Sequence, residues 1–181
     1  AKEHSFAAVN AGYVMEQIVL YLVSKGFATC YLGDAKQKAD LDQYRPMIVV
    51  AFGRAAVSAA KKPSARKKLT ELVEQPPVAE QNARKILEAA RLAPSALNLQ
   101  PWRFQLQQGK IHIFMKKDNL MQTKRMKELN LLGIGIVMCH MALAAEELWL
   151  EWRLSMEEVG SEPTWKGCSY IATLYYETKD F

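Results

Sequence analysis

The stretch Leu92–Phe104, with the sequence LAPSALNLQPWRF, brings together residue types that could bind a ligand. Pro94 ends a helix, and the backbone beyond it can turn its N–H groups outward. Ser95 and Asn98 add short side chains that form hydrogen bonds without filling space. A rigid polar loop beside Trp102 would suit the edge of a planar heteroaromatic ligand. The alternative is a helix cap and turn with Trp102 in the core, and spacing alone favours this alternative.

Two basic runs and two histidines are further candidates. The runs Lys61–Lys68 and Lys116–Lys127 hold much of the excess behind the net charge of +5. We interpret them as solvated loops, with a site for a phosphate-bearing ligand or nucleic acid as the alternative. Cys139 and His140 are neighbours in sequence and could be taken for a catalytic or metal-binding pair. Adjacent side chains on a helix point about 100° apart, which argues against such a pair. We therefore predict that His140 is a hydrogen-bonded core histidine and that His112 lies between strands or at the surface.

The composition indicates an ordinary globular protein. A chain of 181 residues, half of them hydrophobic, can form one domain or two joined halves with a sizeable core. The three cysteines lack paired spacing, which indicates neither a disulfide framework nor a zinc site and favours the reducing cytoplasm. The longest apolar runs, Ala11–Val23 and Leu131–Ala145, are shorter than the roughly 20 residues of a membrane helix. No signal peptide or membrane segment is predicted.

Hydrophobic periodicity predicts the elements that position the loop. The predicted helices cover residues 9–25, 65–75, 83–92 and 131–152. The predicted strands cover residues 47–53, 102–107, 110–115 and 170–177. We expect Val14, Ile18 and Leu22 to form the buried stripe of the first helix, and the apolar run Met47–Gly53 to be a strand covered on both faces. Helices with a mixed, mainly antiparallel sheet make an α+β protein.

The chain also contains an internal repeat. The segment Ala11–Leu20 aligns with Ile134–Leu143, and the strand at Ile48 aligns with the one at Ile171, both at a shift of 123 residues. This repeat predicts two half-domains, 1–76 and 77–181, that form one compact unit with pseudo-two-fold symmetry. Under the same shift, the counterpart of residues 83–115 falls before Ala1. We therefore expect the first half to lack its N-terminal part, or to receive that part in another way.

Three segments together resemble the nitroreductase family of flavoproteins. ILEAARLAPSALNLQPWRF (Ile86–Phe104) closely resembles the family's helix–loop–strand signature, which contacts FMN. SKGFATCYLG (Ser24–Gly33) is similar to the family segment that passes across the flavin ring, and residues 46–73 resemble its strand, loop and phosphate-binding end. The loop follows the ring-contacting segment here instead of preceding it. That order is similar to a branch of the family in which one chain contains two half-domains that mimic the usual homodimer.

The resemblance implies a nitroreductase-like fold with at most one FMN, held between the halves. NAD(P)H would reduce the flavin, and a nitroaromatic, quinone-like or related conjugated acceptor would then take the electrons in the same slot. No side chain needs to be catalytic, because the flavin carries the redox chemistry. The implied flavin contacts are Pro94, Ser95, Ala96 and Asn98 from one half, and Thr29, Cys30, Tyr31, Leu32, Gly33, Arg66 and Lys67 from the other.

The residues leave some of these roles open. Arg66 and Lys67 would bind the FMN phosphate through charge-assisted hydrogen bonds, with a solvated loop as the alternative. Cys30 has no neighbouring base or paired cysteine, so we interpret it as a small packing residue. The alternative functions are a nitroreductase-fold protein that binds flavin without turnover, and one with an empty site and an interaction role. We expect no nucleic-acid partner, and either a monomeric pseudo-dimer or a homodimer.

Overall fold

The computed structural model describes residues 2–33, 46–55, 64–74, 80–117, 123–157 and 163–178, with the side chains described from Phe6 onward. The helices are α1 (Lys2–Ser24), α2 (Leu69–Leu72), α3 (Gln81–Leu92) and α4 (Lys124–Glu147), with a short 3-10 turn η1 (Ala96–Asn98). The strands are β1 (Ala28–Leu32), β2 (Val49–Gly53), β3 (Trp102–Gln107), β4 (Lys110–Lys116), β5 (Leu150–Ser155) and β6 (Cys168–Thr178).

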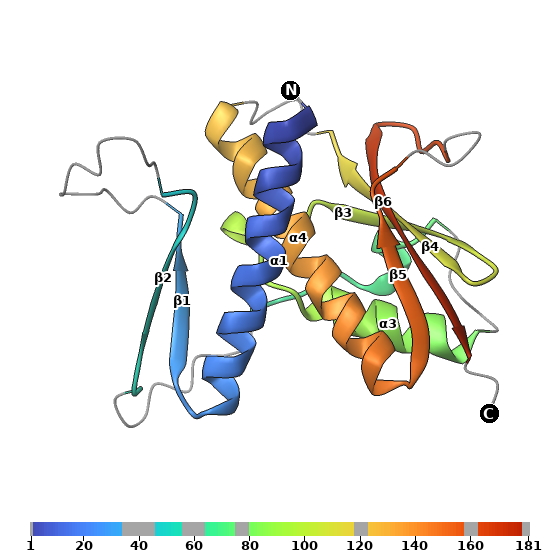
Figure 1. Cartoon of the computed structure of the whole chain (residues 1–181). Helices are drawn as coiled ribbons and strands as arrows, with labels where there is room; N and C mark the ends of the chain where they lie inside the picture. Colours follow the sequence, from blue (N-terminus) through green and yellow to red (C-terminus); the bar gives the residue numbers. More distant parts are fainter. Residues whose placement is uncertain are drawn as a thin grey trace.

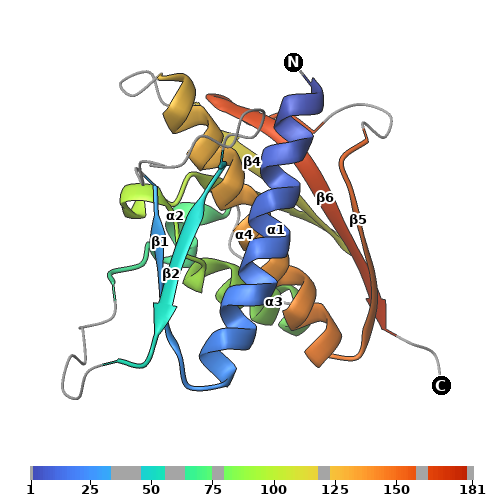
Figure 2. The same cartoon turned by 60° about the vertical axis from the view of Figure 1, so that its left-hand side comes forward.

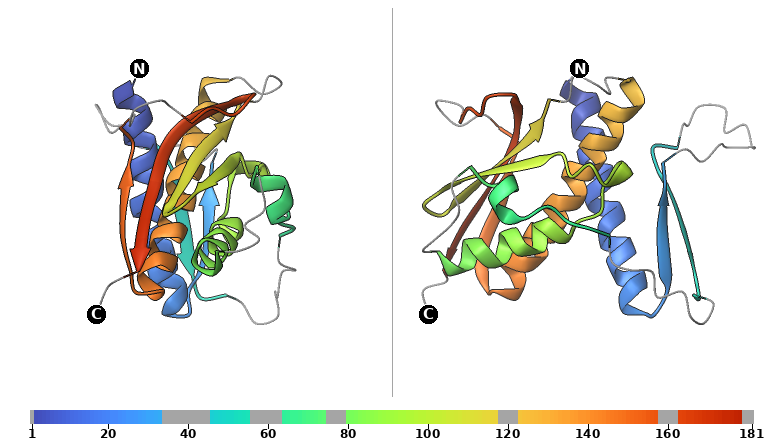
Figure 3. Two further views of the ribbon diagram at one scale, coloured as in Figure 1. Left: turned by 90° about the vertical axis from the view of Figure 1, so that its right-hand side faces the viewer. Right: turned by 180° about the vertical axis from the view of Figure 1, so that it is seen from behind.

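Two sheets lie on opposite sides of a pair of helices (Figure 1). The larger sheet has the strand order β3-β4-β6-β5, and β1 pairs with β2 in a separate hairpin. Helices α1 and α4 stand between the two sheets, and the view from behind in Figure 3 shows the same order. Every strand pair is antiparallel, with one isolated parallel bridge between Val73 and Phe104. The predicted α+β class with a mainly antiparallel sheet is confirmed.

The repeat corresponds to a helix followed by two antiparallel strands. At the shift of 123 residues, α1, β1 and β2 overlie α4, β5 and β6. The two helices cross side by side (Figure 2), and the equivalent residues Gly12 and Gly135 make the close approach. A methyl group on Gly12 would overlap the carbonyl oxygen of Leu132, and one on Gly135 would overlap that of Val9. Val9 and Leu132 are themselves equivalent, so the crossing is pseudo-two-fold; the half-domain boundaries stay a prediction.

This crossing explains why the predicted buried stripe of α1 is wrong. Val14 and Ile18 are 54% and 48% exposed, whereas Val9 and Val19 are buried. Because Gly12 has no side chain, the face that contains it lets the two helix backbones come close together, and this face packs on α4. The broader apolar face of α1 is left at the surface. The C-terminal stop at Gly26 is confirmed, with a φ of 81°.

Two strand predictions also need correction. β2 is not covered on both faces, because its Phe52 is 62% exposed, and it is not a central strand, because within the described residues it pairs with β1 alone. The last long helix ends at Glu147 instead of Trp152. Trp149 adopts a positive φ of 57°, and the chain turns there into β5, a strand that the periodicity did not predict.

The elements that carry the loop agree with the prediction. Ile86, Leu87 and Ala90 form the fully buried face of α3. β3 and β4 form a hairpin that turns at Gly109, whose φ is 66°. His112 on β4 bonds across to Thr173 on β6, with 2.8 Å between Nδ1 and Oγ1, so it lies between strands. The loop between α3 and β3 is thus anchored at both ends by core elements.

Two helices are longer than the apolar runs within them. By length and composition, the segments Phe6–Ser24 and Lys124–Glu147 could cross a membrane, with 28% and 67% of their apolar windows buried. The core helix of a soluble protein and an N-terminal signal sequence pass the same test, so these two helices do not by themselves indicate a membrane protein. The apolar runs Ala11–Val23 and Leu131–Ala145 are too short to span a membrane, but the helices that contain them are long enough.

Candidate functional site

A cavity of about 650 Å³ is lined by residues from both predicted halves. The end of β1 and the segment leading to β2 form one wall, the loop after α3 forms another, and the N-terminal part of α4 forms the floor. The lining residues are Tyr31, Gly33, Ile48, Pro94, Ser95, Ala96, Leu97, Thr123, Arg125, Met126, Leu129, Leu132, Gly133 and Ile136. An enclosure of this size with mainly apolar walls and few polar groups is typical of a small-molecule site.

The cavity brings together residues from the two segments selected from the sequence, the one at 29–33 and the loop at 94–98. Pro94, Ser95 and Ala96 line it together with Tyr31 and Gly33. The other predicted contacts, namely Thr29, Cys30, Leu32, Asn98, Arg66 and Lys67, are not among its lining residues. Their role as flavin contacts stays a prediction, as does that of the residues that do line the cavity.

The loop at the cavity has a strained backbone. Leu97, Asn98 and Gln100 have φ values of 50°, 54° and 49°, in the left-handed region that costs a residue with a side chain about 1 kcal/mol or more. Hydrogen bonds hold this shape: the Gln100 N–H donates to Ser95 Oγ at 2.9 Å, and Asn98 Nδ2 donates to the Ala65 carbonyl at 2.8 Å. Backbone strain that the surroundings enforce is a common feature of binding sites.

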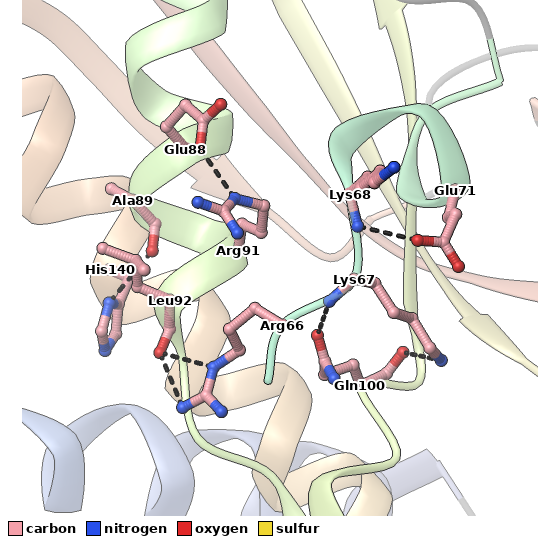
Figure 4. Close-up of polar contacts among 10 residues, drawn as sticks. All are labelled: Arg66, Lys67, Lys68, Glu71, Glu88, Ala89, Arg91, Leu92, Gln100 and His140. Carbon is pink, nitrogen blue, oxygen red and sulfur yellow. Dashed lines mark hydrogen bonds and ion pairs between the residues drawn. The ribbon is translucent and has the colours of Figure 1, made fainter. Parts of the chain in front are cut away.

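The two predicted phosphate ligands form hydrogen bonds with the loop and the end of α3 (Figure 4). Arg66 donates from Nε and Nη2 to the Leu92 carbonyl, each at 3.2 Å, and from Nη1 to Asn98 Oδ1 at 3.1 Å. Lys67 donates from Nζ to the Leu99 carbonyl at 2.7 Å and from its backbone N–H to Gln100 Oε1 at 2.8 Å. Partial burial lowers the pKa of the Arg66 guanidinium from its ordinary value. In these contacts both cations position the loop.

Arg125 is a cavity residue that sequence reasoning did not select. It lies in the first turn of α4 and donates to the Gly33 carbonyl at 2.6 Å and the Met47 carbonyl at 3.0 Å. These bonds connect the end of β1 and the start of β2 to α4. The signal was present in the basic run Lys116–Lys127, but nothing in its spacing distinguishes the cation that reaches the cavity from its neighbours.

A buried polar network lies behind Tyr31. The Tyr31 hydroxyl donates to Glu16 Oε2 at 2.5 Å, and His140 Nε2 lies 2.8 Å from Glu16 Oε1. His140 Nδ1 lies 3.2 Å from the Ala89 carbonyl oxygen, so the prediction of a hydrogen-bonded core histidine is confirmed. Burial first, and then the bond to Glu16, raise the pKa of Tyr31. Sequence reasoning found His140 but missed its carboxylate partner, which lies on a distant helix.

The chain is similar in fold to the crystal structure of a "putative nitroreductase" from Thermotoga maritima, with a TM-score of 0.68 and 25% sequence identity. The match covers 93% of this chain and 64% of that one, so this chain spans less than two thirds of the length of its structural relative. A comparison with curated proteins finds no match. The model of the family described as "Putative TM nitroreductase" matches residues 1–145. The nitroreductase resemblance is thus confirmed, and the chain belongs to this family.

Proposed function

We propose that this protein is an FMN-dependent oxidoreductase that uses NAD(P)H to reduce nitroaromatic, quinone-like or related conjugated acceptors. The observation that carries the proposal is the cavity that Ser95 and Ala96 line together with Tyr31 and Gly33. These residues come from the two segments with the family's flavin-contacting pattern. Membership of the nitroreductase family supports the reaction class, while the flavin, the nicotinamide donor and the acceptor belong to the proposal.

The residues of the cavity fit a flavin mononucleotide. The volume of the cavity, about 650 Å³, is within the range of roughly 300–1,000 Å³ for small-molecule sites. Leu97, Met126 and Ile136 offer apolar surface to the ring system. Arg125 is the cation among the described lining residues, and its guanidinium suits the phosphate, because charge-assisted hydrogen bonds to phosphate are strong.

The chain would bind and orient the cofactor without supplying a catalytic acid or base. Ser95 Oγ accepts a hydrogen bond from the Gln100 N–H, so its own hydroxyl hydrogen can donate to a polar edge of the ring. Gly33 and its neighbours would contribute backbone groups along β1, and the apolar walls would exclude water. Bound FMN supplies the capacity to take a hydride from NAD(P)H and return two electrons to an acceptor.

Absorbance spectroscopy tests the proposal in two steps. Purified protein titrated with FMN should bind it, and anaerobic NADH or NADPH should bleach the flavin bands until a nitroaromatic acceptor restores them. Arg125→Ala should weaken FMN binding, whereas Arg153→Ala, which removes a guanidinium stacked 3.7 Å over the Tyr175 ring outside the cavity, should not. Failure to bind FMN would contradict the proposal. Binding without bleaching by either nucleotide would favour the flavin-binding alternative without turnover.

A cytoplasmic location and a monomeric pseudo-dimer belong to the same proposal. The pseudo-two-fold crossing of α1 and α4 supports a single chain that carries both halves of a dimer-like core. Sedimentation equilibrium of the purified chain would distinguish this state from the homodimer.

A further inference from the structure

Glu16 is a buried acid that no step of the proposed chemistry uses. It lies on the face of α1 that packs against α4, and it is 1% exposed. One carboxylate oxygen accepts from the Tyr31 hydroxyl and the other faces His140 Nε2. Burying a carboxylate costs several kcal/mol unless its partners compensate. The network therefore needs an explanation beyond packing, and its one member on the cavity wall is Tyr31.

Every polar side-chain atom of the Glu16–His140 pair has a hydrogen-bond partner. The Ala89 carbonyl can only accept, so His140 Nδ1, 3.2 Å away, carries a hydrogen. His140 Nε2 and Glu16 Oε1 lie 2.8 Å apart, so each is the hydrogen-bond partner of the other. The remaining oxygen of Glu16 accepts from the Tyr31 hydroxyl in a short 2.5 Å bond.

The network breaks the symmetry of the repeat. At the shift of 123 residues, the counterparts of Glu16, Tyr31 and His140 are Cys139, Leu154 and Gln17. Cys139 is buried and Leu154 is partly buried against the core. The same backbone framework is thus built without the hydrogen bonds on the other side. The network is therefore not a consequence of the symmetry, and Glu16 and Tyr31, its two members from the first half, tie α1 to strand β1, whose Tyr31 lines the cavity.

We propose that Glu16 and His140 are positioning residues for the cofactor site, acting through Tyr31. They hold the Tyr31 side chain toward the α1–α4 interface and thereby fix strand β1 as a wall of the cavity. β1 needs such support because a two-stranded hairpin is marginally stable by itself. The inference rests on the proposed function for the identity of the ligand, but the ordering of β1 does not depend on that ligand.

Hydrogen exchange of the ligand-free chain tests the ordering of β1. Glu16→Gln and Tyr31→Phe should each speed amide exchange in β1 by about tenfold, the effect of losing one hydrogen bond to a charged partner. If Glu16 acts through Tyr31, the double variant should exchange no faster than the single variants. His140→Gln, which introduces the residue found at the equivalent position of the other half, should have the same effect. It replaces Glu16→Gln in the test if that variant does not fold.

Tyr176→Phe is the matched control. The Tyr176 hydroxyl donates to Glu80 Oε1 at the same 2.5 Å, and Tyr176 is buried but lies outside the lining of the cavity. Its loss should lower stability without speeding exchange in β1. Unchanged exchange in the Glu16 and Tyr31 variants, or equal acceleration in the control, would overturn the positioning role.

FMN titration separates this inference from the proposed function. Glu16→Gln and Tyr31→Phe should weaken FMN binding by about tenfold, without additivity, and shift the visible bands of the bound flavin, while Tyr176→Phe leaves both unchanged. Faster exchange in β1 with no FMN binding by the unaltered protein would uphold the positioning of β1 and reject the cofactor. FMN binding of equal strength in all variants would reject the positioning role and uphold the cofactor.

Discussion

The helix crossing makes a sharp prediction about two glycines on one helix. Gly133 and Gly135 are both buried in α4, but only Gly135 touches the backbone of α1. A methyl group at Gly135 would overlap the Val9 carbonyl oxygen, which cannot rotate away as a flexible side chain could. A methyl group at Gly133 would lie 3.8 Å from Ser95 Cβ and 3.9 Å from the Trp102 ring, which is ordinary contact.

The two substitutions should therefore change stability in opposite directions. Alanine is favoured over glycine in a helix by about 1 kcal/mol, and Gly133→Ala should gain part of this. Gly135→Ala gains the same amount but forces α1 away from α4, and overpacking of this kind costs about 1–3 kcal/mol, or more where backbone must move. Separation of the helices also opens the contacts of Val9 and its neighbours. We expect a net loss of about 2 kcal/mol.

Thermal or urea denaturation followed by far-UV circular dichroism measures both effects. For a chain of this size, about 2 kcal/mol lowers Tm by roughly 4–8 °C. Gly12→Ala should lose a similar amount, because it makes the equivalent contact with the Leu132 carbonyl. If Gly135→Ala were as stable as Gly133→Ala, the close approach of α1 and α4 would be refuted, along with the pseudo-two-fold crossing built on it.

Three further predictions concern single residues. Burial lowers the pKa of His112, so protonation favours the unfolded state. The free energy of unfolding should fall as the pH drops below about 6.5 and level off below the folded pKa. Urea titrations at several pH values should show a smaller pH dependence in His112→Asn. Burial raises the pKa of the Cys139 thiol to about 12, so a thiol reagent at pH 8 should label the exposed Cys30 and leave Cys139 unlabelled until denaturant is added, as mass spectrometry of the peptides would show. Leu97→Gly should raise stability by about 1 kcal/mol, since glycine adopts its φ of 50° without strain, and an unchanged urea midpoint would contradict the strain.

Elements whose signals are local could be predicted from the sequence. The turn around Gly109 lies between two alternating runs, and the buried face of α3 follows from a regular spacing of apolar residues. The buried face of α1 could not be predicted in this way, because its apolar residues lie on more than one face of the helix. Which face packs depends on the approach of Gly12 to another helix more than a hundred residues away. Apolar periodicity identifies the face with the most hydrophobic surface, which is not the one that packs closest.

In the candidate site, too, residues within a recognisable motif could be predicted, and residues whose role depends on packing could not. Family resemblance selected Ser95 and Tyr31, which the cavity brings together. Arg66 was selected for its charge, but its described bonds go to the loop, because a guanidinium beside exposed carbonyls can position backbone as readily as it can bind a phosphate. Arg125 and Glu16 were missed because each has a partner remote in sequence. Arg125 donates to the Gly33 carbonyl and Glu16 pairs with His140, and only the packing of α1, β1 and α4 reveals these contacts.

The repeat gives the two halves the same helix and strand pair but different polar chemistry. If symmetry alone determined the interior, the position of Glu16 would hold the same kind of residue in both halves. Instead a buried carboxylate occurs in one half and the buried Cys139 in the other. A carboxylate is the more costly choice in an interior where a thiol also fits. The buried carboxylate, with its desolvation cost, occurs in the half where β1 must be held beside the cavity. It is absent from the equivalent position in the other half, where β5 is already held in a four-stranded sheet. The place where the symmetry breaks therefore supports the proposed ligand site, independent of the loop that first suggested it.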